Sequence, residues 1–231
     1  MQKLKKSFLK AILFYIGLFI VTSLLFACKS SAPVRETAAQ LSTNGKLLIL
    51  PFKDMSAIYG ENVSLRCPLC GNVFVTGEVA EGADTVLTKR LVSLLSDRDD
   101  IELIPPGKGQ GVWSKLLSGG LSERSLIVET GSALGADAVL AGYVHRFRER
   151  IGTRYSVDSP ASVAFDVHLV NVVNGRIMWI GHLDETQQPL SDNLLQLGTF
   201  IKRKGTWITA EEIAFSGLEE MLQKFPAITG H

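Results

Sequence analysis

Ala133-Leu-Gly-Ala-Asp-Ala-Val-Leu-Ala-Gly-Tyr-Val144 is the stretch that decides the fold, because it ends a helix and begins a buried strand. Gly135 stands where a helix stops, and a short turn then leads into an uninterrupted apolar run. The preceding segment, 122–134, spaces its apolar residues three and four apart, which predicts a helix. Residues 145–150 alternate in polarity, so we expect the strand to continue through them.

Helix and strand signals alternate on both sides of this stretch. Asn174-Gly175 joins two strands and is the strongest short hairpin signal in the chain. Thr209-Ala-Glu-Glu212 is a capping box that begins a last helix. In chain order we predict strand 46–52, helix 82–96, strand 101–105, helix 122–134, strands 138–150, 163–173 and 176–185, and helix 209–224. The order βαβαβββα predicts an α/β (α+β) fold, in which helices pack on a mixed sheet of about five strands.

Residues 53–81 are predicted to be an insertion, because they show no helical period between the first strand and the first helix. A connection of that length usually carries function or small structure of its own. Two short β-like runs, 63–65 and 73–75, flank Cys67-Pro-Leu-Cys-Gly71. We therefore expect a small hairpin with both cysteines at its tip.

The N-terminus has the pattern of an export signal. Four lysines and no acid precede an uncharged run from Ala11 to Ala27. The run ends in Leu25-Phe-Ala-Cys28, which resembles the lipobox of bacterial lipoproteins. That resemblance implies cleavage before Cys28, a diacylglyceryl group on its thiol and an acyl chain such as palmitate on its new amine. The alternative is an uncleaved anchor helix, and either reading ties the domain to a membrane.

Charge and composition limit the classes of partner. Removing residues 1–27 takes four of the 24 bases and none of the 23 acids, so the formal charge changes from +1 to −3. Nothing in that balance favours nucleic acid. Residues 28–45, the lipidated cysteine and the polar segment after it, are predicted to be a flexible tether. We expect residues 46–226 to form one periplasmic domain that contains the insertion.

Leu48-Ile-Leu-Pro-Phe52, followed by a helix, a strand, Ala133–Val144 and long strands, resembles a superfamily of envelope proteins. Its members include the curli-secretion lipoproteins, the lipoprotein activators of penicillin-binding proteins and the amino-terminal domain of TolB. The resemblance covers residues 46–185 and implies a binding or assembly module without enzymatic activity. Residues 53–81 and the chain after Glu185 are not matched, so no particular partner is implied.

The Cys67 and Cys70 pair supports three chemistries. A c-type haem attachment is disfavoured because Gly71, not histidine, follows the pair. Structural zinc needs four ligands, and with the histidines expected on distant strands it would require two chains to share one ion. In an oxidising periplasm we predict a disulfide that stiffens the hairpin tip, and no metal or other cofactor.

Two polar sets on the predicted strands are candidate sites. If the Asn174-Gly175 turn has two residues, His168 and His182 lie on opposite faces, which argues against a shared metal. Asp166 shares a face with His168, and a polar outer face of the hairpin is the simplest interpretation of the two. The three arginines of segment 145–150 line one face of a strand end and are predicted to be either a surface for an anionic partner or a charged edge strand; they are Arg146, Arg148 and Arg150.

The sequence thus predicts a membrane-anchored periplasmic lipoprotein that binds or helps assemble another envelope component, with no catalytic residues. The membrane contact is the lipid on Cys28. Lys29 replaces the aspartate that marks inner-membrane retention in enterobacteria, which favours the outer membrane. The protein partner is an envelope protein or a peptidoglycan-associated component, and the oligomeric state stays open. The alternatives are a subunit of an outer-membrane secretion channel of the curli-secretion type and a zinc or redox protein centred on Cys67 and Cys70.

Overall fold

A computed structural model describes residues 45–153, 156–187 and 207–228. These residues belong to one compact unit, Gln40–His231. The predicted signal peptide 1–27, Cys28 and the tether up to residue 44 lie outside the described residues.

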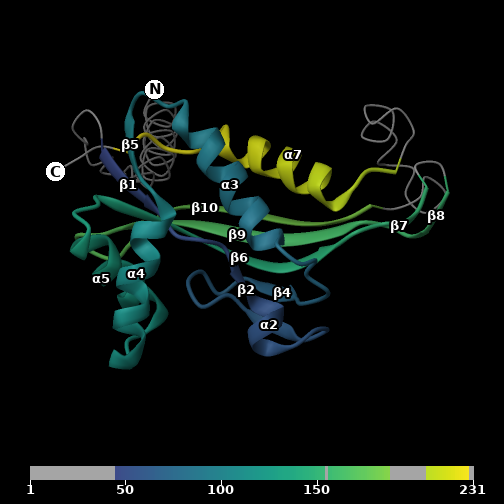
Figure 1. The fold of residues 1–231 in the computed structure, drawn as a ribbon, viewed down its shortest axis with the longest axis horizontal. Helices are drawn as coiled ribbons and strands as arrows, with labels where there is room; N and C mark the ends of the chain where they lie inside the picture. The colour runs from purple at the N-terminus through teal and green to yellow at the C-terminus, as the bar shows by residue number, and fades with distance from the viewer. Residues whose placement is uncertain (1–44, 154–155, 188–206, 229–231) are drawn as a thin grey trace, which may run out of the picture. The chain divides into compact units, whose positions relative to one another are not determined.

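The main sheet is mixed and has six strands, in agreement with the predicted fold class (Figure 1). Its order is β10-β9-β6-β1-β5, and β2 pairs beside β6. The β5, β1 and β6 strands run parallel, whereas β6, β9 and β10 are antiparallel neighbours. The strands of this sheet are β1 (Gly45–Ile49), β2 (Lys53–Asp54), β5 (Ile101–Ile104), β6 (Ala138–Arg148), β9 (Ser162–Asn171) and β10 (Ile177–Thr186). Two hairpins stand apart from it: β3 (Ser64–Arg66) with β4 (Val73–Val75), and β7 (Ile151–Gly152) with β8 (Val157–Ser159).

Helices cover both faces of the sheet (Figure 1). The α3 and α7 helices pack on one face, and α2, α5 and the β3–β4 hairpin pack on the other. The helices are α2 (Met55–Tyr59), α3 (Ala83–Ser96), α4 (Pro106–Leu116), the 3-10 turn η1 (Leu117–Gly119), α5 (Glu123–Ala133) and α7 (Ala210–Leu222). The predicted capping box of the last helix is present, with Thr209 and Glu212 bonded reciprocally. The α5 helix ends at Ala133, and Gly135, just after the cap residue Leu134, has the φ of +65° expected of glycine at a helix stop.

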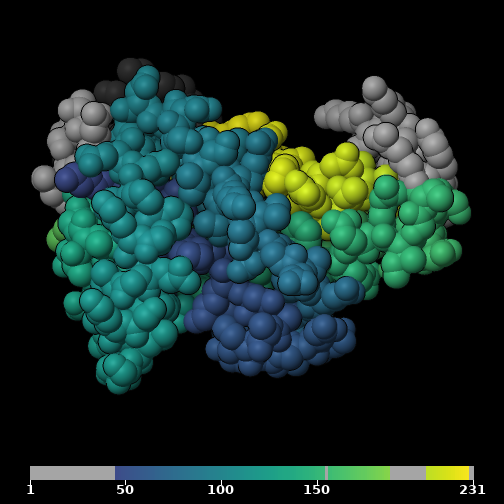
Figure 2. Space-filling model, viewed as in Figure 1, coloured from purple at the N-terminus to yellow at the C-terminus, as the bar shows by residue number. Residues whose placement is uncertain are grey.

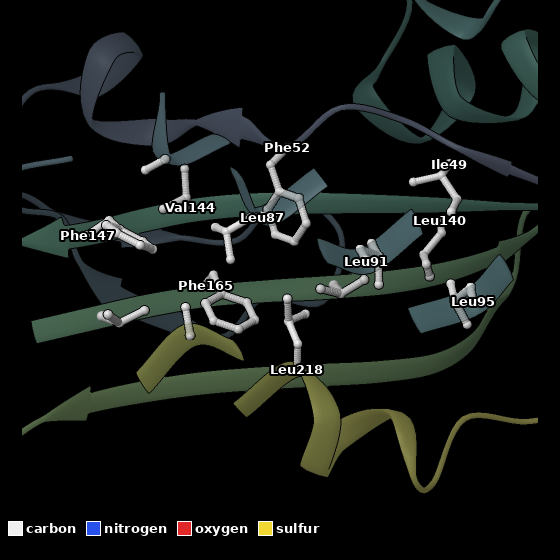
Figure 3. Close-up of a cluster of buried hydrophobic side chains, with 14 of the residues drawn as sticks. Ile49, Phe52, Leu87, Leu91, Leu95, Leu140, Val144, Phe147, Phe165 and Leu218 are labelled. Carbon is white, nitrogen blue, oxygen red and sulfur yellow. The ribbon is translucent and has the colours of Figure 1, made fainter. Parts of the chain in front are cut away.

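The β9 strand separates two hydrophobic cores. All ten of its residues are buried, because helices or the insertion cover both of its faces. Val163, Phe165 and the other odd-numbered apolar positions contact α3 and α7 (Figure 3). Ala164 and Val170 contact α5 and the insertion. Any polar side chain at an even position of β9 is therefore buried beneath the insertion.

The α4 helix is not among the elements predicted from the sequence, because Gly107-Lys-Gly-Gln-Gly111 shows no apolar helical period. Three glycines within five residues lower helix propensity, yet Pro106 begins the helix in the position that proline favours. Gly109 also allows α4 to lie close to β1: a Cβ there would be 2.9 Å from Leu50 Cδ2. Close packing against the first strand thus overrides the weak local preference.

Candidate functional site

The insertion forms the predicted hairpin and packs its tip on the sheet. The Cys67 amide donates to the Asn72 carbonyl (2.7 Å), and the Gly71 amide donates to the Cys67 carbonyl (3.0 Å). Gly71 has a φ of +79°, which suits glycine in so tight a turn. The Arg124 guanidinium of α5 donates to the Leu69 carbonyl (3.0 Å), so this hydrogen bond ties the hairpin tip to α5.

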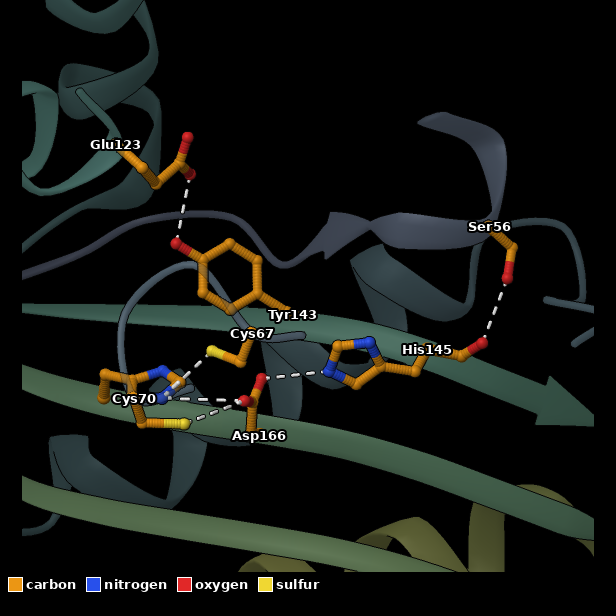
Figure 4. A network of polar contacts seen from close by, with 8 residues as sticks. Ser56, Cys67, Cys70, Glu123, Tyr143, His145 and Asp166 are labelled. Carbon is orange, nitrogen blue, oxygen red and sulfur yellow. Dashed lines mark hydrogen bonds and ion pairs between the residues drawn. The ribbon is translucent and has the colours of Figure 1, made fainter. Parts of the chain in front are cut away.

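Four side chains that could bind one metal ion meet beneath this tip: Cys67, Cys70, Asp166 and His168. The first two come from the hairpin and the last two from one face of β9. Their ligand atoms all lie within 4.8 Å of one another. Cys67 Sγ is 3.5 Å from His168 Nε2, Cys70 Sγ is 3.8 Å from Asp166 Oδ2, and His168 Nε2 is 3.5 Å from the same Oδ2 (Figure 4). Asp166 and His168 are fully buried.

His145 supports the cluster from β6. A bulge between Val144 and Arg146 breaks the strand register at this residue. The ring nitrogen Nε2 of His145 lies 3.2 Å from Asp166 Oδ1, and the ring stacks on Phe74 with centroids 4.1 Å apart. Asp166 therefore sits between two imidazoles (Figure 4). No local pattern in the sequence indicates the bulge, and so none indicates the role of His145.

Burial governs the protonation of the cluster. Desolvation, and then the charge of Asp166, raise the pKa of the Cys67 thiol above its usual range. Desolvation lowers the pKa of His168, although the Asp166 carboxylate opposes the change. Without a bound cation, the site thus favours a neutral thiol and a neutral imidazole. A metal ion would reverse that preference by stabilising the thiolate.

The predicted disulfide is not formed in the structure, where Cys67 and Cys70 are both free. Each sulfur instead has a partner on β9, as the distances above show. The expectation that the histidines lie on strands distant from these cysteines is wrong for His168. It failed because the hairpin folds back over β9, which brings residues about a hundred positions apart into contact.

The predicted register of the β9–β10 hairpin is also wrong. The turn spans residues 172–176 instead of two residues, and a bulge follows near Ile177. His182 pairs with Asp166, and His168 pairs with Ile180. Directly paired residues share a face, so His168 and His182 lie on the same face and not on opposite ones. His182 is exposed on the edge strand, outside the four-residue cluster.

A separate pocket lies beside the cluster. Its cavity of about 190 Å³ is lined by Phe52 and Lys53 after β1, Trp113 of α4, Glu123 of α5 and Tyr143 of β6. The Tyr143 hydroxyl donates to Glu123 (3.0 Å), and Lys53 forms an ion pair with the same carboxylate (3.1 Å). Burial and the Glu123 charge raise the pKa of Tyr143. The Tyr143 ring also approaches His168, with centroids 5.8 Å apart, so one side chain separates pocket and cluster.

The position of this pocket follows from the sheet topology. The chain passes from β1 to β5 on one side and then to β6 on the other side of β1. The connections therefore reverse direction at β1, and the pocket lies just beyond its carboxyl end. Ligands of open α/β sheets bind at such switch points. In the space-filling view, a notch separates α4 from the segment after β1 (Figure 2).

The predicted arginine surface is partly occupied by internal contacts. Arg146 donates to the Val75 carbonyl (3.0 Å) and to Ser162 Oγ (2.6 Å), and pairs with Asp184 (2.5 Å). Arg146 and Arg148 line one cavity, which also contains Glu61 and Glu78. Arg150 does not line it. The structure thus surrounds Arg146 with acceptors of the chain itself, and an anionic partner at these arginines stays a prediction.

Within residues 45–153, 156–187 and 207–228, no helix combines the length and the apolar character needed to cross a bilayer. The site of the proposed membrane anchor lies before these ranges.

Comparison with known proteins gives distant structural likenesses. No protein-family model matches the chain, and no curated protein matches it in sequence. PelC from Paraburkholderia phytofirmans, solved as a dodecamer, is 14% identical with a TM-score of 0.44, over 79% of this chain and 87% of that one. The LpoB C-terminal domain from Salmonella enterica is 19% identical with a TM-score of 0.35, over 64% and 87%. A lipoprotein from Neisseria meningitidis is 14% identical with a TM-score of 0.37, over 70% and 98%. Each TM-score is below 0.5, so these likenesses give no information about the function of this chain.

Proposed function

We propose that this chain is a lipid-anchored protein of the bacterial envelope whose α/β domain binds or helps assemble another envelope component. The observation that carries the proposal is the uncharged run 11–27, which ends in the lipobox-like Leu25-Phe-Ala-Cys28. A polar tether then separates the modified cysteine from β1. Lipid on Cys28 anchors the domain, and the tether lets it reach a partner.

The switch-point pocket is the side of the domain that we assign to partner binding. It presents Trp113 beside the carboxyl end of β1, and aromatic side chains contribute much of the energy of protein interfaces. Lys53 and Glu123 add a charged pair at the same place. A cavity of about 190 Å³ is smaller than a typical drug-sized site, which favours one inserted side chain of a partner over a free ligand. We propose that the domain acts by binding, without turnover.

Lipidation is the first prediction. We expect Cys28→Ser to abolish acylation and to move the protein from the detergent phase to the aqueous phase in a two-phase partition of cell envelopes. Mass spectrometry of the wild-type membrane form should show an acylated Cys28 as the first residue. An intact Met1 on that form would contradict the proposal.

Partner binding is tested by photo-crosslinking in living cells. A photoreactive amino acid at Gln110, which is exposed at the pocket, should give discrete adducts with an envelope component. The matched control is the same amino acid at Lys89, exposed on α3 at the opposite face of the sheet. Adducts at both positions alike, or at neither, would refute a specific partner at the pocket.

A further inference from the structure

We propose that Cys67, Cys70, Asp166 and His168 of a single chain bind one zinc ion, which fastens the insertion to β9. All four ligand atoms come from the described residues and already face one another. Cysteine thiolate, imidazole and carboxylate are the donors that zinc uses in proteins. This site is independent of the lipid anchor, so the two proposals can fail separately.

The spacing of the ligand atoms fits tetrahedral zinc. Zinc bonds of about 2.3 Å to sulfur and about 2.0–2.2 Å to nitrogen and oxygen place neighbouring ligand atoms about 3.3–3.8 Å apart in a tetrahedron. Three of the six separations between the ligand atoms, 3.5, 3.8 and 3.5 Å, lie in that interval, and all six are within 4.8 Å. The Cys-x-x-Cys tip resembles one knuckle of a zinc ribbon and supplies two ligands, and residues i and i+2 of β9 supply the other two. The side chains need no large movement to accept the ion.

Burial gives the second reason for a cation. Asp166 is fully buried, and a buried carboxylate is costly unless charged groups and hydrogen bonds compensate it. A divalent ion bound to Oδ2 would provide that compensation, while His145 holds Oδ1 (3.2 Å). Outer-shell contacts of this kind orient metal ligands. Zinc binding would release the protons of the two thiols to solvent.

The geometry indicates a structural role for this zinc. Four protein ligands complete the tetrahedral shell, whereas catalytic zinc keeps a position open for water. Three of the four residues are buried, and Cys70 is half-buried. The ion would join two segments that lie 96 to 101 residues apart in the chain. Zinc thus stabilises the packing of the insertion, beyond the contacts of Leu69 and Phe74 with the core.

The decisive experiment uses the full-length chain with Cys28→Ser, because Cys67 and Cys70 are then its only cysteines. The protein is purified without chelators, and bound metal and free thiols are counted. We expect about one zinc per chain and two thiols that react only after zinc removal. One zinc per two chains would overturn the proposal. So would a disulfide that, once reduced, still leaves the chain unable to bind added Zn²⁺.

Ligand variants identify the residues. Asp166→Asn and His168→Gln keep the size of each side chain, and each should weaken Zn²⁺ binding more than about tenfold, since loss of an outer-shell partner alone costs 10–100-fold. The matched control is His182→Gln, which pairs with Asp166 across the strands but is exposed. Its affinity for Zn²⁺ should be unchanged. Unchanged affinity in Asp166→Asn and His168→Gln would overturn the assignment.

If these variants fail to fold, the absorption spectrum of Co²⁺ bound to the chain with all four ligands intact still tests the proposal. Co²⁺ replaces zinc in the Cys28→Ser chain and reports both geometry and donor type. We expect intense visible bands of a tetrahedral ion and near-ultraviolet charge-transfer bands from two thiolates. A weak octahedral spectrum without thiolate bands would refute the proposed ligand set.

Discussion

The Arg98 guanidinium joins the turn before β5 to the segment that follows α7. It bonds both carboxylate oxygens of Asp100, at 2.8 and 2.5 Å, and also reaches the carbonyls of Phe225 and Pro226. The hydrogen bonds from Arg98 lower the pKa of Asp100 below its ordinary value of about 3.8. Because the folded pKa is the lower one, this pair stabilises the fold above about pH 3.8. The contribution is lost as the pH falls through the folded pKa.

We therefore predict that Asp100→Asn lowers the free energy of unfolding at pH 7 and that the difference from wild type shrinks steadily below about pH 3.8. The effect should be small, because the Asp100 side chain is 37% exposed. Urea unfolding at a series of pH values measures it. Asp99→Asn, at the exposed neighbouring position, is the control and should show little change. A difference between Asp100→Asn and wild type that persists unchanged into strong acid would contradict this account.

At the scale of single elements, two helical glycines have opposite surroundings. A Cβ on Gly131 of α5 would lie 2.5 Å from Val139 and 2.6 Å from Val172, so Gly131 permits the helix to pack on the sheet. A Cβ on Gly111 of α4 would meet nothing within 4 Å. The same substitution should therefore act in opposite directions at these two positions.

We predict that Gly131→Ala destabilises the domain by about 1–3 kcal/mol, since overpacking against strand side chains exceeds the gain in helix propensity. Gly111→Ala should stabilise it by about 0.5–1 kcal/mol, because alanine loses less backbone entropy on folding. Chemical unfolding of both variants under the same conditions provides the measurement. Equal shifts of the same sign would show that helix propensity, not packing, controls these positions.

At the scale of the whole molecule, local patterns predict most of the elements but not the long-range contacts. The β1, β5, β6, β9 and β10 strands and the α3, α5 and α7 helices follow from apolar periodicity, capping residues and Gly135, all of which act within a few positions. The bulge at His145 and the register of β10 depend on packing between strands, which local patterns do not encode.

The candidate metal site shows the same limit. The spacing of Cys67 and Cys70 and the shared strand face of Asp166 and His168 are both apparent in the sequence. Their meeting required the docking of the insertion on β9, which periodicity cannot predict. A useful signal is nevertheless present: β9 carries two ionisable residues, Asp166 and His168, at even positions of a strand whose other positions are mostly apolar. Buried polar residues of this kind need partners from elsewhere in the fold.

The last prediction concerns the division of the domain into two parts that respond differently to zinc. The core between the sheet and α3 and α7 contains no residue of the β3–β4 hairpin, and only Val79 and Ala80, at the end of the insertion, pack against it. Its contacts therefore do not depend on the ion. The second core includes Cys67, Leu69 and Phe74 of the hairpin, whose few apolar contacts the zinc would reinforce.

We expect chelation of zinc to speed amide hydrogen exchange in residues 61–76, while exchange in α3 and α7 stays within about twofold, because local opening need not involve the whole fold. Addition of Zn²⁺ should restore protection in wild type and fail to do so in His168→Gln. Loss of protection in α3 and α7 together with the hairpin would contradict the prediction, because it would mean that the ion holds the whole domain and not the insertion alone.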